Sequence, residues 1–155
     1  MGIEIERKFL VDHEKWSQVN KPAGTHYRQG YILADSGRTV RVRISDKNAF
    51  LNLKSKSTNM SRHEYEYEIP LEEGKEILDN LVLNGTEKVR YRIDFSGKVW
   101  EVDVFLGDNA GLIIAEIELE SEDERFEKPE WVTNEVTDDG RYTNAALAKF
   151  PFKQW

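Results

Sequence analysis

Charged side chains recur at every second residue in several short segments of this chain, and most of these rows are dominated by one sign. The basic rows are Arg41 and Arg43, Lys54 and Lys56, and Lys88, Arg90 and Arg92. The remaining rows are Glu4, Glu6 and Lys8, then Arg62, Glu64, Glu66 and Glu68, then Glu101 and Asp103, and last Glu116, Glu118 and Glu120. Arginine and lysine can bind phosphate oxygens, and gathered carboxylates can bind hard divalent cations.

An apolar residue separates most neighbouring charges, and this period-two alternation is typical of β-strands. Successive strand side chains point to opposite faces, so each predicted strand has a charged face and an apolar face. The alternation covers residues 2–10, 26–34, 38–46, 49–56, 62–69, 86–95, 98–106 and 111–120. Short turn signals such as Asp35-Ser36-Gly37 and Ser96-Gly97 link several of them and predict antiparallel hairpins.

Three helices are predicted between and after these strands. Residues 71–83 follow Pro70, carry Glu72 and Glu73 in the first turn, and end at Asn84-Gly85. Residues 144–150 form a short C-terminal helix that ends before Pro151, with Asn144 as a candidate N-cap, and residues 121–127 form a further short helix. The expected fold is a single domain over residues 1–155, mainly β with the few helices of an α+β protein. Its strands form an eight-stranded antiparallel closed barrel or two packed sheets.

The alternation permits two arrangements of the charged rows. In an ordinary barrel the apolar rows lie inside and the charged rows face water, which also protects against aggregation. The segregation of charge by sign argues against that arrangement, because like charges at neighbouring positions of one strand face repel each other. With the charged rows inside, the barrel would be a hydrated tunnel with basic and acidic sectors.

Composition limits the possible functions. The formal net charge of −7 disfavours nucleic-acid binding. No apolar run approaches the ~18 residues that would cross a membrane, and the charged N-terminal segment does not resemble a signal peptide. The chain has no cysteine, which excludes disulfides, thiolate metal sites and a cysteine nucleophile, and we expect a cytoplasmic protein. The histidines are scattered, so a histidine-rich metal site is not expected.

The charged rows occur in an order that resembles a known family. Glu4, Glu6 and Lys8 form an ExExK pattern, the hallmark of the CYTH, or triphosphate tunnel metalloenzyme, family. The accompanying segments are Gln29-Gly30-Tyr31, Arg41-Val42-Arg43, Leu53-Lys54-Ser55-Lys56, Arg62-His63-Glu64-Tyr65-Glu66, Lys88-Val89-Arg90-Tyr91, Glu101-Val102-Asp103-Val104, Glu116-Ile117-Glu118, Glu135-Val136-Thr137 and Arg141-Tyr142-Thr143-Asn144. The resemblance covers essentially the whole chain and is greatest to the compact bacterial branch.

The resemblance implies an eight-stranded tunnel with inward charges that binds a triphosphate and uses Mg²⁺ or Mn²⁺. The metal ligands that it implies are Glu4, Glu6, Glu116 and Glu118, with Glu64 and Glu66 either binding a second ion or pairing with nearby cations. The implied phosphate-binding residues are Lys8, Arg41, Arg43, Lys54, Lys56, Arg62, Lys88 and Arg90. Structural ion pairing between the basic and acidic rows is the alternative role for all of these side chains.

Tyr31 and Lys54 match positions that parts of the family assign to a proton-accepting pair, with Lys8 beside them. A free tyrosine titrates near ~10, so a neighbouring cation is required to make the phenolate accessible. A packed, hydrogen-bonded aromatic residue is the alternative role for Tyr31. Arg141 and Asn144 lie in a C-terminal segment that could close one end of the tunnel.

The leading function is hydrolysis of inorganic triphosphate to pyrophosphate and phosphate. Alternatives within the family are adenylate cyclase and thiamine or nucleoside triphosphatase, and a polyphosphate- or nucleotide-binding module without turnover is a further possibility. The cyclases carry a His-Phe lead-in before ExExK, whereas this chain begins almost at the motif, which favours hydrolysis. A homodimer is possible, but the sequence shows no interface.

Overall fold

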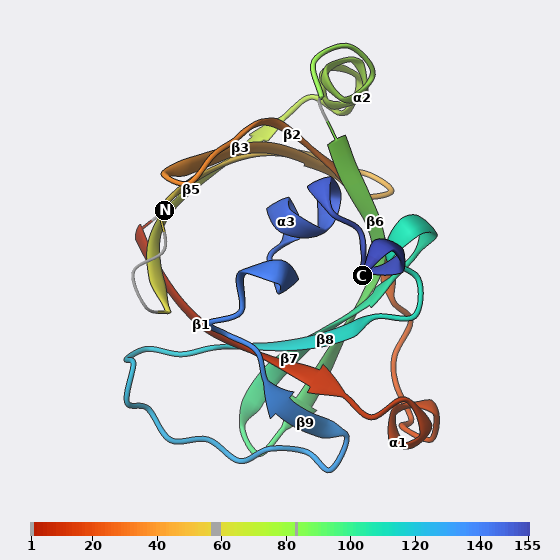
Figure 1. Ribbon diagram of the computed structural model, residues 1–155, viewed down its shortest axis with the longest axis vertical. Helices are drawn as coiled ribbons and strands as arrows, with labels where there is room; N and C mark the ends of the chain where they lie inside the picture. The colour runs from red at the N-terminus through yellow and green to blue at the C-terminus, as the bar shows by residue number, and fades with distance from the viewer. Residues whose placement is uncertain (1, 57–59, 83) are drawn as a thin grey trace.

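The strands of this chain form a closed ring in the computed structural model, which describes residues 2–56, 60–82 and 84–155 (Figure 1). The strands are β1 (Gly2–Val11), β2 (Thr25–Ala34), β3 (Arg38–Ile44), β4 (Ala49–Ser55), β5 (Ser61–Ile69), β6 (Asn84–Phe95), β7 (Lys98–Phe105), β8 (Ile113–Glu118) and β9 (Val132–Glu135). They follow the order β5-β4-β3-β2-β6-β7-β8-β1-β9, and a further pairing between β5 and β1 closes the barrel. All pairings are antiparallel, as predicted.

Within the described residues, three short helices accompany the barrel. These are α1 (His13–Ser17), α2 (Leu71–Asn80) and α3 (Asn144–Lys149), with 3₁₀ turns η1 (Gly107–Asn109), η2 (Gly140–Tyr142) and η3 (Phe152–Gln154). Figure 1 shows α2 and α1 outside the ring and α3 within it. Pro70 precedes α2 as expected, but the helix ends at Asn80, and Asn84 already begins β6. Residue 83, the last of the predicted helix, lies outside the described residues.

The helix predicted over residues 121–127 is wrong. A single turn, in which the Glu124 amide donates to the Ser121 carbonyl, is followed by irregular chain. Phe126 explains the difference, because its ring packs edge-to-face on Phe9 and Trp100 and holds the segment against the outer wall. The sequence analysis also missed β9, whose four residues contain one apolar side chain and pair with the end of β1.

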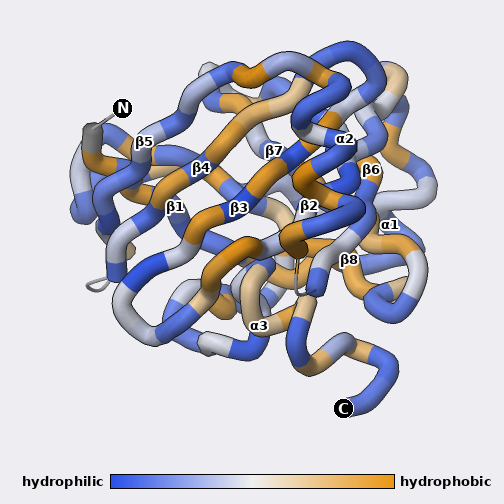
Figure 2. The backbone as a smooth tube through the Cα atoms, turned by 90° about the horizontal axis from the view of Figure 1, so that it is seen from above, coloured by the Kyte–Doolittle hydropathy of each residue, from blue (hydrophilic) through white to orange (hydrophobic). Residues whose placement is uncertain are grey.

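The main hydrophobic core lies outside the barrel wall. The apolar faces of β1, β7 and β8 are covered there by α1, β9 and the chain that precedes β9. Trp100 is fully buried in this core, and the Trp131 ring packs edge-to-face on it and on Trp16. In Figure 2 the strands alternate along their length between hydrophilic and hydrophobic residues, as a wall with two different faces requires.

The interior changes from charged to apolar toward one end. Beyond the inward charges of β1, β7 and β8, the next residues of the same parity are Leu10, Phe105 and Ile114. These three side chains form a smaller cluster with Leu147, which is fully buried on α3. The helix is therefore held within the ring by apolar packing, in the position expected of a C-terminal segment that closes one end of the tunnel.

Among the described residues, none of the helices has the length and apolar character needed to cross a membrane.

Candidate active site

Charged residues of β1, β3, β4 and β5 line two neighbouring cavities. The larger, of about 150 Å³, is lined by the predicted residues Tyr31, Arg41, Lys54, Lys56 and Arg62, with Thr143 and Asn144 from the segment that begins α3. The smaller, of about 50 Å³, is lined by Glu4, Glu6, Lys8 and Arg62 together with Met60, Thr137 and Thr143. Arg62 lines both cavities, so the two spaces adjoin.

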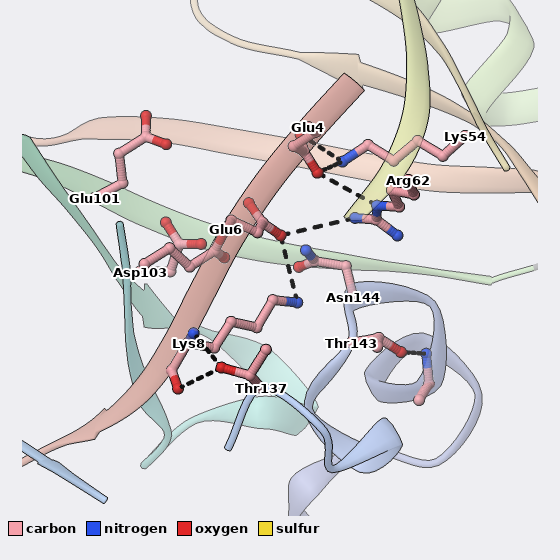
Figure 3. Close-up of polar contacts among 12 residues, drawn as sticks. Glu4, Glu6, Lys8, Lys54, Arg62, Glu101, Asp103, Thr137, Thr143 and Asn144 are labelled. Carbon is pink, nitrogen blue, oxygen red and sulfur yellow. Dashed lines mark hydrogen bonds and ion pairs between the residues drawn. The ribbon is translucent and has the colours of Figure 1, made fainter. Parts of the chain in front are cut away.

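The carboxylates of β1 face cationic side chains of β4 and β5 inside the ring (Figure 3). Glu4 accepts hydrogen bonds from Lys54 Nζ at 3.4 Å and from Arg62 Nε at 3.3 Å. Glu6 lies 3.8 Å from Arg62 Nη2 and 4.0 Å from Lys8 Nζ. Glu4 and Glu6 raise the pKa of Arg62 against the opposing effect of burial.

Glu64 and Glu66 pair with cations, which was the alternative to their binding a second metal ion. Glu64 lies 3.0 Å from Lys54 Nζ, and this lysine lowers the pKa of Glu64 although burial opposes the shift. Glu66 accepts a 2.6 Å hydrogen bond from Asn52 Nδ2 and lies 3.4 Å from Arg43. Either carboxylate would have to leave its partner before binding a metal.

A buried network joins β6 to β7. Asp103 is fully buried and accepts bonds from Lys88 Nζ at 2.8 Å and from Arg90 Nε and Nη2 at 2.7 and 2.9 Å. These two cations hold the pKa of Asp103 well below its ordinary value, although burial acts to raise it. Burial lowers the pKa of Lys88 to about 8, with Arg90 adding to the shift and Asp103 opposing it.

Arg41 and Arg43 form the basic side of the tunnel on β3. Both guanidinium groups have a buried Nε that finds no hydrogen-bond partner among the described residues. Burial lowers the pKa of Arg43, and the charges of Arg41 and Arg90 add to this effect. Buried donors that lack partners are costly, so this wall favours an anion that would accept from them.

The acidic residues of β1 and β8 have the donor chemistry for a hard cation. The strand register sets Glu6 directly opposite Glu118, and it sets Glu116 opposite Glu101 of β7. Like charges in facing positions destabilise a sheet. Burial raises the pKa of Glu116, and Glu6 adds to the shift; burial likewise raises the pKa of Glu118, and Glu4 adds to it. A bound cation would relieve this repulsion.

The carboxylates are nevertheless not gathered for a metal as they stand. No group of three potential ligand side chains within residues 2–56, 60–82 and 84–155 is close enough to hold an ion. Glu4 and Glu6 face Lys54, Arg62 and Lys8 instead, so metal binding would exchange these ion pairs for metal–oxygen bonds.

Tyr31 and Lys54 line the same cavity, as their assignment to a pair requires. The Tyr31 side chain is 3% exposed, and this burial raises the pKa of its hydroxyl despite the opposing charges of Arg41 and Arg62. The phenolate is therefore harder to form than in a free tyrosine. Burial lowers the pKa of Lys54, and Arg41 and Arg62 add to the effect.

Three polar residues join the site although they were absent from the predicted site residues: Asp103, Gln29 and Asn144. Asp103 was recognised only as part of a charged row, and Gln29 only as part of a motif. The N-cap of α3 is Thr143 rather than Asn144: Thr143 Oγ1 accepts from the Ala146 amide at 3.1 Å. The Asn144 carboxamide instead accepts hydrogen bonds from Gln29 and Lys88.

Two predicted residues lie at the margin of the site. Lys56 is exposed at the end of β4, although it still lines the larger cavity. Arg141 pairs with Asp139 at 2.8 Å, and its guanidinium lies 4.7 Å from the centre of the Trp155 ring. Arg141 therefore stabilises the C-terminal segment locally.

Comparisons with known proteins match this chain over nearly its whole length. The CYTH domain family model matches residues 2–146. An inorganic triphosphatase of Acetivibrio thermocellus is 49% identical over 156 residues, which cover 100% of this chain and 99% of that protein. An inorganic triphosphatase of Nitrosomonas europaea is 36% identical over 94% of this chain and 96% of its own length. The crystal structure of an inorganic triphosphatase superimposes with a TM-score of 0.66 at 35% identity, covering 94% of this chain and 93% of that chain.

Proposed function

This chain belongs to the CYTH domain family, and from that membership we infer that it hydrolyses inorganic triphosphate to pyrophosphate and phosphate inside its tunnel. One observation carries the inference furthest. The buried Nε atoms of Arg41 and Arg43 lack hydrogen-bond partners within the described residues, beside a cavity lined by further cations. A linear polyanion of several phosphoryl groups has acceptors for such a wall.

The basic side chains fall into two groups, one along the sides of the tunnel and one near the end where α3 lies. We propose that Arg41, Arg43, Lys54, Lys56, Arg62 and Lys8 bind the phosphoryl groups from the sides, and that Lys88 and Arg90 bind them from the closed end. Arginine supplies planar, bidentate contacts, whereas lysine supplies a compact charge. These groups would also stabilise the negative charge that develops on the phosphoryl oxygens and on departing pyrophosphate.

We propose that four glutamates of β1 and β8 bind a divalent cation, Mg²⁺ or Mn²⁺. They are Glu4, Glu6, Glu116 and Glu118. Glu64 and Glu66 are proposed as ligands of a second ion, for which they would have to leave Lys54 and Arg43. When bound, the metal would supply positive charge next to the phosphoryl oxygens. The protein contributes ligands whose mutual repulsion in facing strands is relieved by that charge.

The reaction is attack by water on a terminal phosphorus. A new P–O bond forms to the water oxygen, the bond to the bridging oxygen breaks, and pyrophosphate leaves. The proton that the water loses passes to a product phosphate oxygen or to solvent. We propose that Lys54 and Tyr31 contact the attacking water, with Lys8 orienting the phosphoryl group. The raised pKa of Tyr31 favours its protonated hydroxyl, so its contribution is to donate a hydrogen bond unless bound cations lower that pKa.

Several further expectations accompany this proposal. They are cytoplasmic residence, a single domain over residues 1–155, a small polyanionic substrate in place of nucleic acid or membrane, and a possible homodimer.

The test is phosphate release by the purified protein from tripolyphosphate, with Mg²⁺, with Mn²⁺ and with EDTA, and with ATP as the competing substrate. We expect metal-dependent release from tripolyphosphate and much less from ATP. Absence of release with every metal would reject hydrolysis and leave a binding module. Formation of pyrophosphate and cyclic AMP from ATP would instead identify a cyclase.

A further inference from the structure

Asn144 is the first residue of α3, and its side chain points away from the helix toward the tunnel wall. Thr143 provides the N-cap hydrogen bond, so the Asn144 carboxamide is not needed for capping. Its Oδ1 accepts from Lys88 Nζ at 3.3 Å and from Gln29 Nε2 at 3.1 Å. One amide oxygen thus joins α3 to β6 and to β2.

Chemistry determines which end of the carboxamide faces Lys88. An ammonium group has three donors and no acceptor, so only the oxygen of Asn144 can bond to it. The amide nitrogen must then point elsewhere, and Asn144 lines the larger cavity. The orientation therefore places an N–H donor, rather than an acceptor, on the cavity side.

Lys88 lies where the charged interior meets the apolar end. Its Nζ contacts Asp103 at 2.8 Å and lies 5.7 Å from the centre of the Phe105 ring. Two of its three N–H donors are used by Asp103 and Asn144. The direction of the third N–H depends on both partners being present.

We propose that Asn144 is a positioning residue that orients the ammonium group of Lys88 toward the substrate at the closed end of the tunnel. The proposal deepens the triphosphatase function inferred above and rests on it. It gives α3 a specific polar role in addition to the apolar packing of Leu147.

Two substitutions test the hydrogen bond between Asn144 and Lys88: one removes the acceptor oxygen, and the other gives it a negative charge. Asn144→Ala removes the acceptor, and we expect KM for tripolyphosphate to rise about tenfold while kcat changes about twofold or less. Asn144→Asp keeps the size and the acceptor oxygen, so its folding is little at risk. It places a carboxylate oxygen on the cavity side, and we expect a larger rise in KM because that oxygen repels phosphate.

A measurement that does not depend on turnover is the NMR titration of Lys88 Nζ in the metal-free protein. The groups that face Lys88 are Asp103, Arg90 and Glu116, and these stay constant among the variants. Asn144→Ala should move the Lys88 titration to lower pH, and Asn144→Asp should move it to higher pH. A residue that only supported the helix would not shift the titration in opposite directions.

Lys149→Ala is the matched control, because Lys149 also anchors α3, by donating to the Ala34 carbonyl at 2.6 Å on the exposed side. It should leave KM and the Lys88 titration unchanged. Unchanged KM and titration in both Asn144 variants would overturn the proposal, as would the same changes in Lys149→Ala. If the wild-type protein releases no phosphate, the proposed function fails separately, and the titration still tests the contact.

Discussion

At the scale of single residues, the position of Lys88 has the clearest consequence for pH dependence. The side chain is 1% exposed, and burial lowers its pKa from 10.5 to about 8. The ammonium form therefore predominates below about pH 8 and is lost as the pH rises further. Arginine stays protonated throughout, so Arg41 and Arg62 do not share this behaviour, whereas burial also lowers the pKa of Lys54.

We therefore predict that KM for tripolyphosphate rises as the pH increases above about 8, because binding an anion then requires protonation of Lys88. A Lys88→Arg variant keeps its charge, and its KM should lack this rise. Ionisation of the substrate affects both proteins equally, so the difference between the two KM profiles isolates Lys88. Parallel profiles in folded protein would contradict the assignment.

Tyr31 provides a second test at this scale. With a raised pKa, its hydroxyl should act as a hydrogen-bond donor, and Tyr31→Phe should lower kcat about tenfold without changing the shape of the pH profile. Removal of a general base would instead abolish the acidic limb of the profile, because protonation of the base causes that limb. Tyr91→Phe is the control, since Tyr91 packs on Trp16 outside the wall. Unchanged turnover at every pH would exclude any catalytic role for Tyr31.

At the scale of elements, the pairing of β1 with β8 places carboxylates opposite each other, and a bound metal ion would relieve their electrostatic repulsion. Glu6 and Glu118 occupy facing positions, and Glu116 lies one step further along the same face of β8. The neighbouring pair of β6 and β7 shows the opposite arrangement, because Arg90 faces Asp103. One side of the barrel is thus neutralised internally, whereas on the other side Glu6 faces Glu118, and a bound cation would relieve that repulsion.

Metal binding should therefore raise the thermal stability of the protein. We predict that saturating Mg²⁺ or Mn²⁺ increases Tm by about 3–5 °C. Glu118→Gln removes one of the facing charges, so the increase should fall by at least half, whereas the exposed Glu120→Gln should preserve it. Equal metal-induced shifts in all three proteins, measured by calorimetry at fixed ionic strength, would place the metal elsewhere.

At the scale of the whole molecule, stability and function are separated by the barrel wall. The main core of tryptophan, phenylalanine and aliphatic side chains lies on the outer side of β1, β7 and β8. The two cavities of the candidate site lie on the inner side and are lined mostly by charged and polar residues. Damage to one side therefore has a limited effect on the other as long as the barrel stays closed.

Trp131→Ala tests this separation. The ring is 6% exposed and packs on Trp16 and Trp100, so its removal should lower the free energy of unfolding by about 3–5 kcal/mol. KM for tripolyphosphate at a temperature where the variant is folded should stay within about twofold of the wild-type value. A large rise in KM alongside intact secondary structure would show that the outer core also shapes the tunnel.

The amino-acid sequence by itself determined the strands, the antiparallel connections and the family, because alternation and ordered charge motifs are local properties of the chain. The prediction failed where distant contacts outweigh local pattern. Phe126 is held by the outer core rather than by a helix, and four-residue β9 exists only because β1 offers an edge to pair with. The site residues gathered in the tunnel were largely those of the predicted rows, and their individual roles stay predictions.

Only the tertiary structure decided which face of the barrel was inside, since alternation is the same whether the charged rows point inward or outward. Closure of β5 onto β1 brought the rows together, and the strand register then chose their partners. Glu6 thereby faces a carboxylate, whereas Arg90 faces Asp103. The contact between Asn144 and Lys88 joins residues 56 positions apart, and it depends on the packing of Leu147 that places α3 within the ring.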